Sequence, residues 1–241
     1  MLVVQSVAEQ VRETLTRAII EGELLPNAVL SDRQLSEQLG VSRTPIREAF
    51  HQLESSGLLR RRSRVGWVVA DLKRKDVEEL IELRTILEVA GVQRVVKWPE
   101  AELAALAASF DVFAQPLDPA AYAAYLQQDR AFHNTLVKAT DNSRIVEVYR
   151  VVEWQIDRIR HLVSYRVQNR VDHSFKEHRR ICAALASRDA PGAVAALEGH
   201  FSNVQKKFVE LLEANAGSFG SRSQVEASGL LGRPDAATQS P

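Results

Sequence analysis

Four polar residues fall on apolar helical stripes in the second half of the sequence. Asp129 and His133 are four residues apart in one periodic segment, so both side chains leave the same face of a helix on consecutive turns. His178 and His200 lie on the apolar stripes of two later segments. Three imidazoles and one carboxylate suit a divalent transition metal, with zinc as the first candidate and nickel, cobalt or manganese as alternatives.

The same residues have a second interpretation that needs no metal. Each histidine is then a hydrogen-bonded core residue, and Asp129 pairs with Arg130 or another arginine, because a buried carboxylate is costly without a partner. The convergence of all four residues on one interior favours the metal. Arg84 also lies on an apolar stripe and needs a buried counter-ion, for which Glu88 and Glu153 are candidates.

Arginines are concentrated between residues 42 and 64. The whole chain has 31 basic and 31 acidic side chains, so its net charge alone predicts no polyanionic partner. In this window, however, six arginines face only Glu48 and Glu54, which leaves a local charge of +4. Arginine binds phosphates and guanine edges in a bidentate manner, so the window is a candidate nucleic-acid contact. The alternative is a solvated charged face.

The first seventy residues predict elements that would present these arginines. The predicted elements are helices over residues 6–22, 31–40 and 42–57, with Ser31 and Ser42 as N-cap candidates, and two strands on either side of a polar tip at 60–64. Two short helices joined by a brief glycine-containing turn are typical of the helix-turn-helix. The two strands would form a basic wing beside it.

This region resembles the winged-helix signature of GntR-family bacterial transcription regulators. The resemblance is carried by Gly22-Glu23-Leu24, Pro26, Leu30-Ser31, Gln34-Leu35, the run Gly-Val-Ser-Arg-Thr-Pro-Ile-Arg-Glu-Ala at 40–49, Leu53 and Gly57-Leu58. It implies DNA contacts from Arg33, Ser42, Arg43, Thr44, Pro45, Arg47 and Gly66. A winged helix that contacts only protein is the alternative. Asn27 departs from the glycine that the family usually has after the proline, but asparagine tolerates positive φ, so we expect the turn to persist.

From residue 72 the periodicity indicates helices alone. Helices are predicted over residues 75–96, 100–114, 119–139, 143–168, 174–187 and 190–214. Ser174 and Glu177 have capping-box spacing, and Asp189 and Asn142 are further cap candidates. An antiparallel helical bundle is the simplest fold, and such bundles build ligand and metal sites from facing helices.

The bundle resembles the helical effector domain, often called FCD, of the FadR-type subfamily of GntR regulators. The resemblance rests on Asp129 with His133, Glu177-His178, His200, and the segment from Glu82-Leu83-Arg84 to Leu87-Glu88. It implies that the Asp and the three His hold a metal and that Arg84 binds the carboxylate of an effector. A small organic acid that touches the ion is favoured over a long acyl-CoA.

The expected fold class is therefore mainly α, with two domains. Residues 1–71 form a winged helix-turn-helix DNA-binding domain, residues 72–214 an all-α antiparallel helical bundle for effector binding, metal binding and dimerisation, and residues 215–241 a disordered tail. No apolar run is long enough to span a membrane, and the single cysteine, Cys182, forms no internal disulfide. We expect a cytoplasmic protein without a membrane partner.

These features predict a ligand-responsive regulator of transcription and not an enzyme. It would be a repressor that binds double-stranded operator DNA as a homodimer at an inverted repeat and is released by a small carboxylate effector. The repressing sign comes from the resemblance. Two other functions stay open, a metal-dependent enzyme in which the ion activates water and a pure metal sensor.

Overall fold

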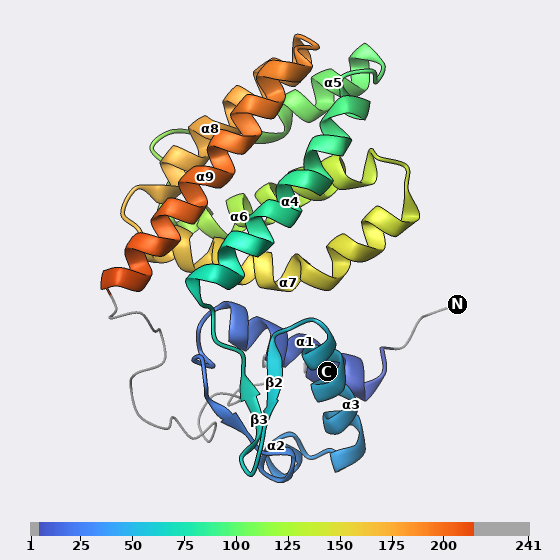
Figure 1. Ribbon diagram of the computed structural model, residues 1–241, viewed down its shortest axis with the longest axis vertical. Helices are drawn as coiled ribbons and strands as arrows, with labels where there is room; N and C mark the ends of the chain where they lie inside the picture. Colours follow the sequence, from blue (N-terminus) through green and yellow to red (C-terminus); the bar gives the residue numbers. More distant parts are fainter. Residues whose placement is uncertain (1–4, 215–241) are drawn as a thin grey trace, which may run out of the picture. The chain divides into compact units, whose positions relative to one another are not determined.

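The computed structural model describes residues 5–214, so the prediction of a disordered tail at 215–241 lies outside the described residues. The chain divides between Asp71 and Leu72 into two compact units, which are described separately (Figure 1). The predicted mainly α fold is confirmed: helices dominate the described residues, and strands occur only in the first unit. No helix between residues 5 and 214 combines the length and apolar character that a membrane span requires.

The first unit contains three helices, as the periodicity predicts. They are α1 (Val7–Ile20), α2 (Asp32–Leu39) and α3 (Arg43–Ser55). Ser31 caps α2 by accepting a hydrogen bond from the Gln34 amide, and Gly40 ends it in the left-handed conformation at φ 65°. Ser42 occupies the N-cap position of α3, but its side chain makes no capping hydrogen bond, so the predicted side-chain cap is wrong.

A three-stranded antiparallel sheet completes this unit. Its strands are β1 (Val29–Leu30), β2 (Leu59–Arg62) and β3 (Gly66–Val69), in the order β1-β3-β2. The predicted tip at 60–64 is too long, because residues 60–62 pair with β3 and the turn narrows to 63–65. The two-residue β1 was not predicted, since it is too short to show alternation.

Asn27 keeps the turn ahead of β1 despite its departure from glycine. It adopts φ 64°, as expected, and its amide donates to the Val69 carbonyl over 2.9 Å. Its side-chain oxygen also accepts a 2.6 Å hydrogen bond from Arg60 on β2. The asparagine therefore holds the turn and the base of the wing together.

The second unit is a bundle of helices. They are α4 (Arg74–Val95), α5 (Glu100–Ala107), α6 (Tyr122–Lys138), α7 (Ser143–Arg166), α8 (Arg170–Ala186) and α9 (Ala190–Ala214), with 3-10 turns at Ala108–Phe110 and Pro119–Ala121. The α5 helix ends seven residues before the predicted position, 114, and a 3-10 turn follows it.

Caps in this unit agree with the prediction at two positions and differ at a third. Asn142 accepts from the amides of Arg144 and Ile145 at the start of α7, and Asp189 accepts from the Gly192 amide at the start of α9. The predicted capping box at residues 174–177 is wrong, because α8 already begins at residue 170. Ser174 and Glu177 consequently lie inside the helix, buried against its neighbours.

The bundle brings α4 and α9 together, and α4 also packs on α6 while α8 packs on α9 (Figure 1). At Gly91 the backbones of α4 and α6 approach so closely that a Cβ there would lie 1.8 Å from the Leu136 carbonyl oxygen. Only glycine permits this contact. The interior between these helices contains several buried charged groups, among them Arg84, Glu88 and Asp129, and the candidate site lies among them.

Candidate metal centre and nucleic-acid interface

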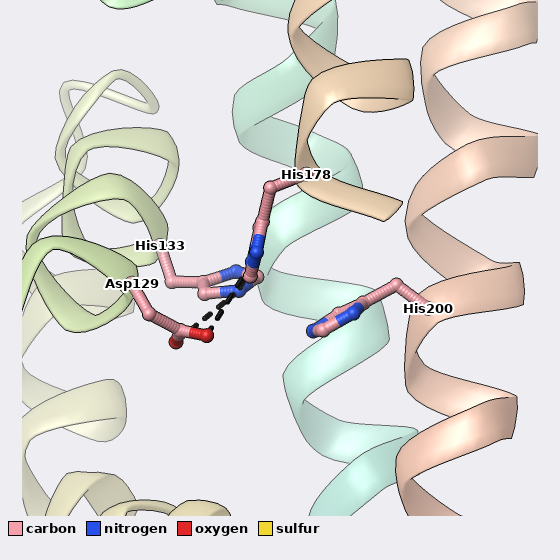
Figure 2. Close-up of side chains that lie close together, drawn as sticks. All are labelled: Asp129, His133, His178 and His200. Atoms are coloured by element: carbon pink, nitrogen blue, oxygen red, sulfur yellow. Dashed lines mark hydrogen bonds and ion pairs between the residues drawn. The ribbon is translucent and has the colours of Figure 1, made fainter. Parts of the chain in front are cut away.

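The bundle brings the four predicted metal ligands together. Asp129 and His133 project from α6, His178 from α8 and His200 from α9. The side chains from these three helices converge in the interior of the bundle (Figure 2). All four are buried, and one ligand atom from each lies within 4.8 Å of the others. The structure thus places these residues in one cluster, as the sequence predicts.

Within the cluster, the Nε2 atoms of His133 and His178 face each other and Asp129. His133 Nε2 lies 3.0 Å from His178 Nε2 and 3.7 Å from Asp129 Oδ1, and His178 Nε2 lies 3.5 Å from Asp129 Oδ2. The His200 ring stacks on the His133 ring with centroids 5.4 Å apart. The inward atoms are those that a metal uses as ligands.

The outward Nδ1 atom of each histidine has its own hydrogen-bonding partner. His133 Nδ1 lies 2.5 Å from Glu88 Oε2 on α4, and His200 Nδ1 lies 2.7 Å from Glu177 Oε2 on α8. His178 Nδ1 lies 2.7 Å from the Tyr125 hydroxyl. Metal-ligating histidines typically hydrogen-bond through their other nitrogen to a carboxylate or similar acceptor, which fixes the tautomer and the ring orientation.

Burial keeps the three imidazoles neutral. It lowers the pKa of His178 to about 3, although the nearby Asp129 charge opposes the shift. Burial likewise lowers the pKa of His133 well below its usual range and lowers that of His200 against the opposing effect of Glu177. A neutral imidazole has a free lone pair on one nitrogen, which is the form that binds a metal.

Asp129 stays ionised because of a buried arginine. Burial alone would raise its pKa, but the charge of Arg160 leads the effects that lower it on balance. Arg160 Nε lies 2.5 Å from Asp129 Oδ1. Of the two pairing possibilities in the sequence, another arginine is therefore the one observed, since Arg130 instead pairs with Glu153 and Asp157.

The donor set fits a divalent transition metal. Three neutral imidazoles and one carboxylate carry a net charge of −1, which a divalent cation reverses. Asp129 Oδ1 is buried and accepts no well-aligned hydrogen bond among the described residues, despite its ion pair with Arg160. His200 likewise uses only Nδ1 in the hydrogen bonds of the described chain. A cation would satisfy both groups, whereas hydrogen bonds alone leave them incomplete.

Arg84 lies beside this cluster on α4. Its Nε donates to Oε1 of Glu88 over 2.6 Å, and Glu88 is one of the two predicted counter-ions. The Cζ atom of Arg84 lies 4.4 Å from the centroid of the Phe201 ring. Its Nη2 is buried and has no hydrogen-bond partner within residues 5–214. Arg84, Asp129 and His200 line one small cavity with a free volume of about 20 Å³.

The residues expected to contact DNA lie on one exposed part of the first unit. Burial of Ile46, Ala49, Phe50 and Leu53 turns the opposite side of α3 outward, so that Ser42, Arg43, Thr44 and Arg47 are exposed and Pro45 is half-buried. Arg33 on α2 is exposed and pairs loosely with Glu37 at 3.6 Å. Gly66, with φ 101°, begins β3 at the wing.

An open groove of about 460 Å³ lies beside the wing. Its lining includes Asp32 and Arg47 from the helices and Arg61, Gly66 and Trp67 from the wing. Arg61 also lies over the Trp67 ring at 5.0 Å. Most of the DNA-contact residues predicted from the sequence thus occupy the first turns of α3 and the start of the wing, where a winged helix meets a duplex.

Comparison with protein-family models decides the family. Residues 7–69 match the model of bacterial regulatory proteins of the gntR family, and residues 79–203 match that of the FCD domain. The chain belongs to the GntR family. Its FCD domain covers more than half of the sequence, and the GntR protein therefore combines the two domains that the resemblance implied.

Two curated relatives of this GntR protein are named as repressors of bacterial operons. A probable D-xylose utilization operon transcriptional repressor of Paenarthrobacter nicotinovorans is 28% identical over 195 residues, covering 81% of this chain and 85% of the relative. The gluconate operon transcriptional repressor of Bacillus subtilis is 26% identical over 214 residues, covering 86% of each. The family and these relatives are transcriptional regulators and not enzymes, and a GntR-type helix-turn-helix binds DNA.

Solved structures give the same result. A GntR regulator from Rhodococcus sp. RHA1 superposes with a TM-score of 0.68 at 26% identity, covering 86% of this chain and 99% of that one. A Zn²⁺-bound FCD domain of another transcriptional regulator superposes with a TM-score of 0.50 at 25% identity, covering 59% of this chain and 98% of that one. An FCD domain similar to this one therefore accepts zinc.

Several residues of the cluster were not assigned a role from the sequence. The sequence pointed to Glu177 only as a capping-box residue and as part of the Glu177-His178 pair of the FCD resemblance, and it gave no role to Tyr125, Arg160 or Arg170. Arg170 makes a bidentate ion pair with Glu177 at 3.1 and 2.8 Å. For Arg160 and Arg170 the available signal is that polar side chains recur beside the apolar stripes of α7 and α8, whereas Tyr125 on α6 carries none.

Proposed function

We propose that this GntR-family repressor is released from its operator by a small organic acid that binds beside a divalent metal in the helical domain. Residues 1–71 would bind DNA through Arg33, Ser42, Arg43, Thr44, Pro45, Arg47 and Gly66, and residues 72–214 would bind effector and metal and form the dimer. Asp129, His133, His178 and His200 would hold the ion, with zinc as the first candidate.

One observation carries this proposal. Arg84 lines the same small cavity as Asp129 and His200, and its buried Nη2 has no hydrogen-bond partner among residues 5–214. A carboxylate in that cavity would accept a hydrogen bond from Arg84 and also reach the ion. The metal would supply a positive charge that binds the acid, while the chain supplies an arginine that orients it.

The cavity restricts the size of the acid. A free volume of about 20 Å³ holds one or two water molecules, so the cavity has to widen to admit even a small acid and would have to widen far more for a long chain. The gluconate operon repressor named above regulates genes for a small carboxylate, which agrees with this class. The ion pairs of Arg84, Arg160 and Arg170 would rearrange as the acid enters.

The homodimer has a candidate surface on two helices that pack against each other. Ile86 on α4 is 62% exposed, and Val148 and Val151 on α7 are 45% and 52% exposed. Contiguous exposed apolar patches mark protein interaction sites, and these side chains on neighbouring helices would form one such patch. A two-fold dimer presents two recognition helices, so the operator would be an inverted repeat.

The regulation follows from linkage between the two sites. An effector that binds the DNA-free conformation more tightly lowers operator affinity, and the operator lowers effector affinity by the same factor. The metal has to be present for the acid to bind tightly, since the acid would share the ion with the four protein ligands.

The test measures metal content and operator release together. His178→Ala should remove bound metal, as measured by elemental analysis, and should abolish release by a panel of small organic acids in gel-shift titrations. His173→Ala is the matched control, because His173 is exposed on the same helix. Release by metal with no acid added would instead identify a metal sensor, and unchanged metal content in His178→Ala would refute the site.

A further inference from the structure

Asp32 holds two of the arginines that are expected to contact DNA. It is the first residue of α2, and its side chain is 18% exposed. Arg43 Nη2 donates to Asp32 Oδ1 and Oδ2 over 3.0 and 2.9 Å, and Arg47 Nε donates to Asp32 Oδ2 over 2.6 Å. One carboxylate on α2 thus binds two guanidinium groups on α3.

The arrangement depends on the spacing of the two arginines. Arg43 and Arg47 are four residues apart in α3, so both side chains leave the same face, and α2 packs against α3. Both arginines are more than half exposed, at 53% and 58%, and would otherwise sample many rotamers. The hydrogen bonds to Asp32 restrict them before any DNA arrives.

Donors remain available for DNA. An arginine has five N–H groups. Among the described residues Arg47 uses only Nε and Arg43 only Nη2 in hydrogen bonds, so each keeps further donors for base edges or phosphates. Asp32 and Arg47 also line the open groove beside the wing, so the held guanidinium lies at a surface that a duplex can reach.

Electrostatics alone would disfavour an acid at this position. Burial raises the pKa of Asp32, but hydrogen bonds from Arg47 and Arg43 lower it on balance, so the group is ionised. A carboxylate facing DNA repels phosphates and cancels part of the positive charge of the arginines. A carboxylate that only added charge would weaken binding to every DNA sequence.

We propose that Asp32 is a positioning residue that gives the DNA interface its sequence discrimination. It directs Arg43 and Arg47 toward base edges and lowers the affinity for DNA phosphates in general. It therefore increases the affinity for the operator sequence relative to the affinity for other DNA sequences. This inference rests on the proposed DNA contacts of the two arginines. It adds a residue that touches the DNA-contacting groups instead of the DNA.

The test compares two DNA duplexes. One is selected from a random library by the wild-type protein, and the other is a scrambled duplex of the same composition. Asp32→Asn should bind the scrambled duplex at least as tightly as the wild type and the selected duplex more weakly. The ratio of the two affinities should fall roughly fivefold or more, the loss expected when a bidentate base contact is misaligned.

Glu37→Gln is the matched control. Glu37 lies on the same helix and also pairs with an arginine, but over 3.6 Å and at an exposed position, so its removal changes the charge equally without releasing a held guanidinium. It should leave the affinity ratio unchanged. If Asp32→Asn behaves like Glu37→Gln, with equal changes for both duplexes, the positioning role is refuted.

Two further variants separate the possible failures. In an Arg47→Ala background Asp32→Asn should lower the ratio less, because one of its two partners is gone. Asp32→Glu keeps the charge and moves the carboxylate by one methylene, so a reduced ratio for this variant supports positioning even if Asp32→Asn does not fold. If Arg43→Ala and Arg47→Ala leave binding of the selected duplex unchanged, the proposed DNA contacts themselves are wrong.

Discussion

Gly91→Ala tests whether the close approach of α4 and α6 supports the buried cluster. A Cβ at this position would lie 1.8 Å from the Leu136 carbonyl oxygen, and the helices would have to separate by roughly 1.5 Å to restore ordinary contact. Overpacking of a core costs about 1–3 kcal/mol. The upper end applies here, because the neighbour is backbone and cannot rotate away.

The same separation should reach the metal site. Glu88 precedes Gly91 by one turn of α4, and His133 precedes Leu136 by one turn of α6, so the strain acts next to their 2.5 Å hydrogen bond. Loss of such a supporting bond lowers metal affinity about 10- to 100-fold. We therefore expect lower stability and weaker metal binding in one variant.

Thermal unfolding and metal titration measure the two effects. A loss of about 3 kcal/mol lowers the midpoint by roughly 6–12 °C in a chain of this size. Gly199→Ala is the control, because its Cβ would meet no atom within 4 Å and it lies next to His200 on a helix. It should raise stability by about 0.5–1 kcal/mol. An unchanged unfolding midpoint for Gly91→Ala would refute the packing argument. If the variant is destabilised but its metal affinity is unchanged, the strain at Gly91 does not disturb the hydrogen bond between Glu88 and His133.

Two further predictions concern the DNA interface and the lone cysteine. Arg43→Ala should weaken binding to a selected operator by about 1–3 kcal/mol in fluorescence anisotropy titrations, and full affinity would remove this residue from the contact set. Burial raises the pKa of the Cys182 thiol to about 12, so the thiolate fraction near neutral pH falls roughly a thousandfold below that of a free cysteine. The native protein should react far more slowly with an aromatic disulfide reagent than the protein in guanidinium chloride, and equal rates would contradict the burial.

The sequence predicts the helices and the inward ligands well, because both are visible in periodicity. Asp129 and His133 could be placed on one face from their spacing alone, and the caps at Asn142 and Asp189 follow from residue type and position. The start of α8 could not be predicted in this way. Its N-cap residue is Asn169, which has a left-handed conformation at φ 56°, whereas Ser174 has the sequence of a better N-cap.

The supporting groups of the cluster could not be predicted in the same way. Glu88 meets His133 across 45 positions of sequence, and Tyr125 meets His178 across 53. Such pairs depend on how far each helix slides and rotates against its neighbours, which the periodicity of a single helix does not contain. Arg160 was missed for the same reason, because its partner Asp129 lies on another helix.

Asn27 shows what a departure from the usual family residue can add. Glycine would adopt the positive φ of this turn without strain, but it has no side chain to accept the hydrogen bond from Arg60, 33 positions later. With asparagine, a small conformational cost in the turn is exchanged for a tether on the first arginine of β2. This hydrogen bond restricts the movement of β2, the first strand of the basic wing, relative to the turn at Asn27. Substitutions in this turn can therefore change the position of the wing although they lie outside it.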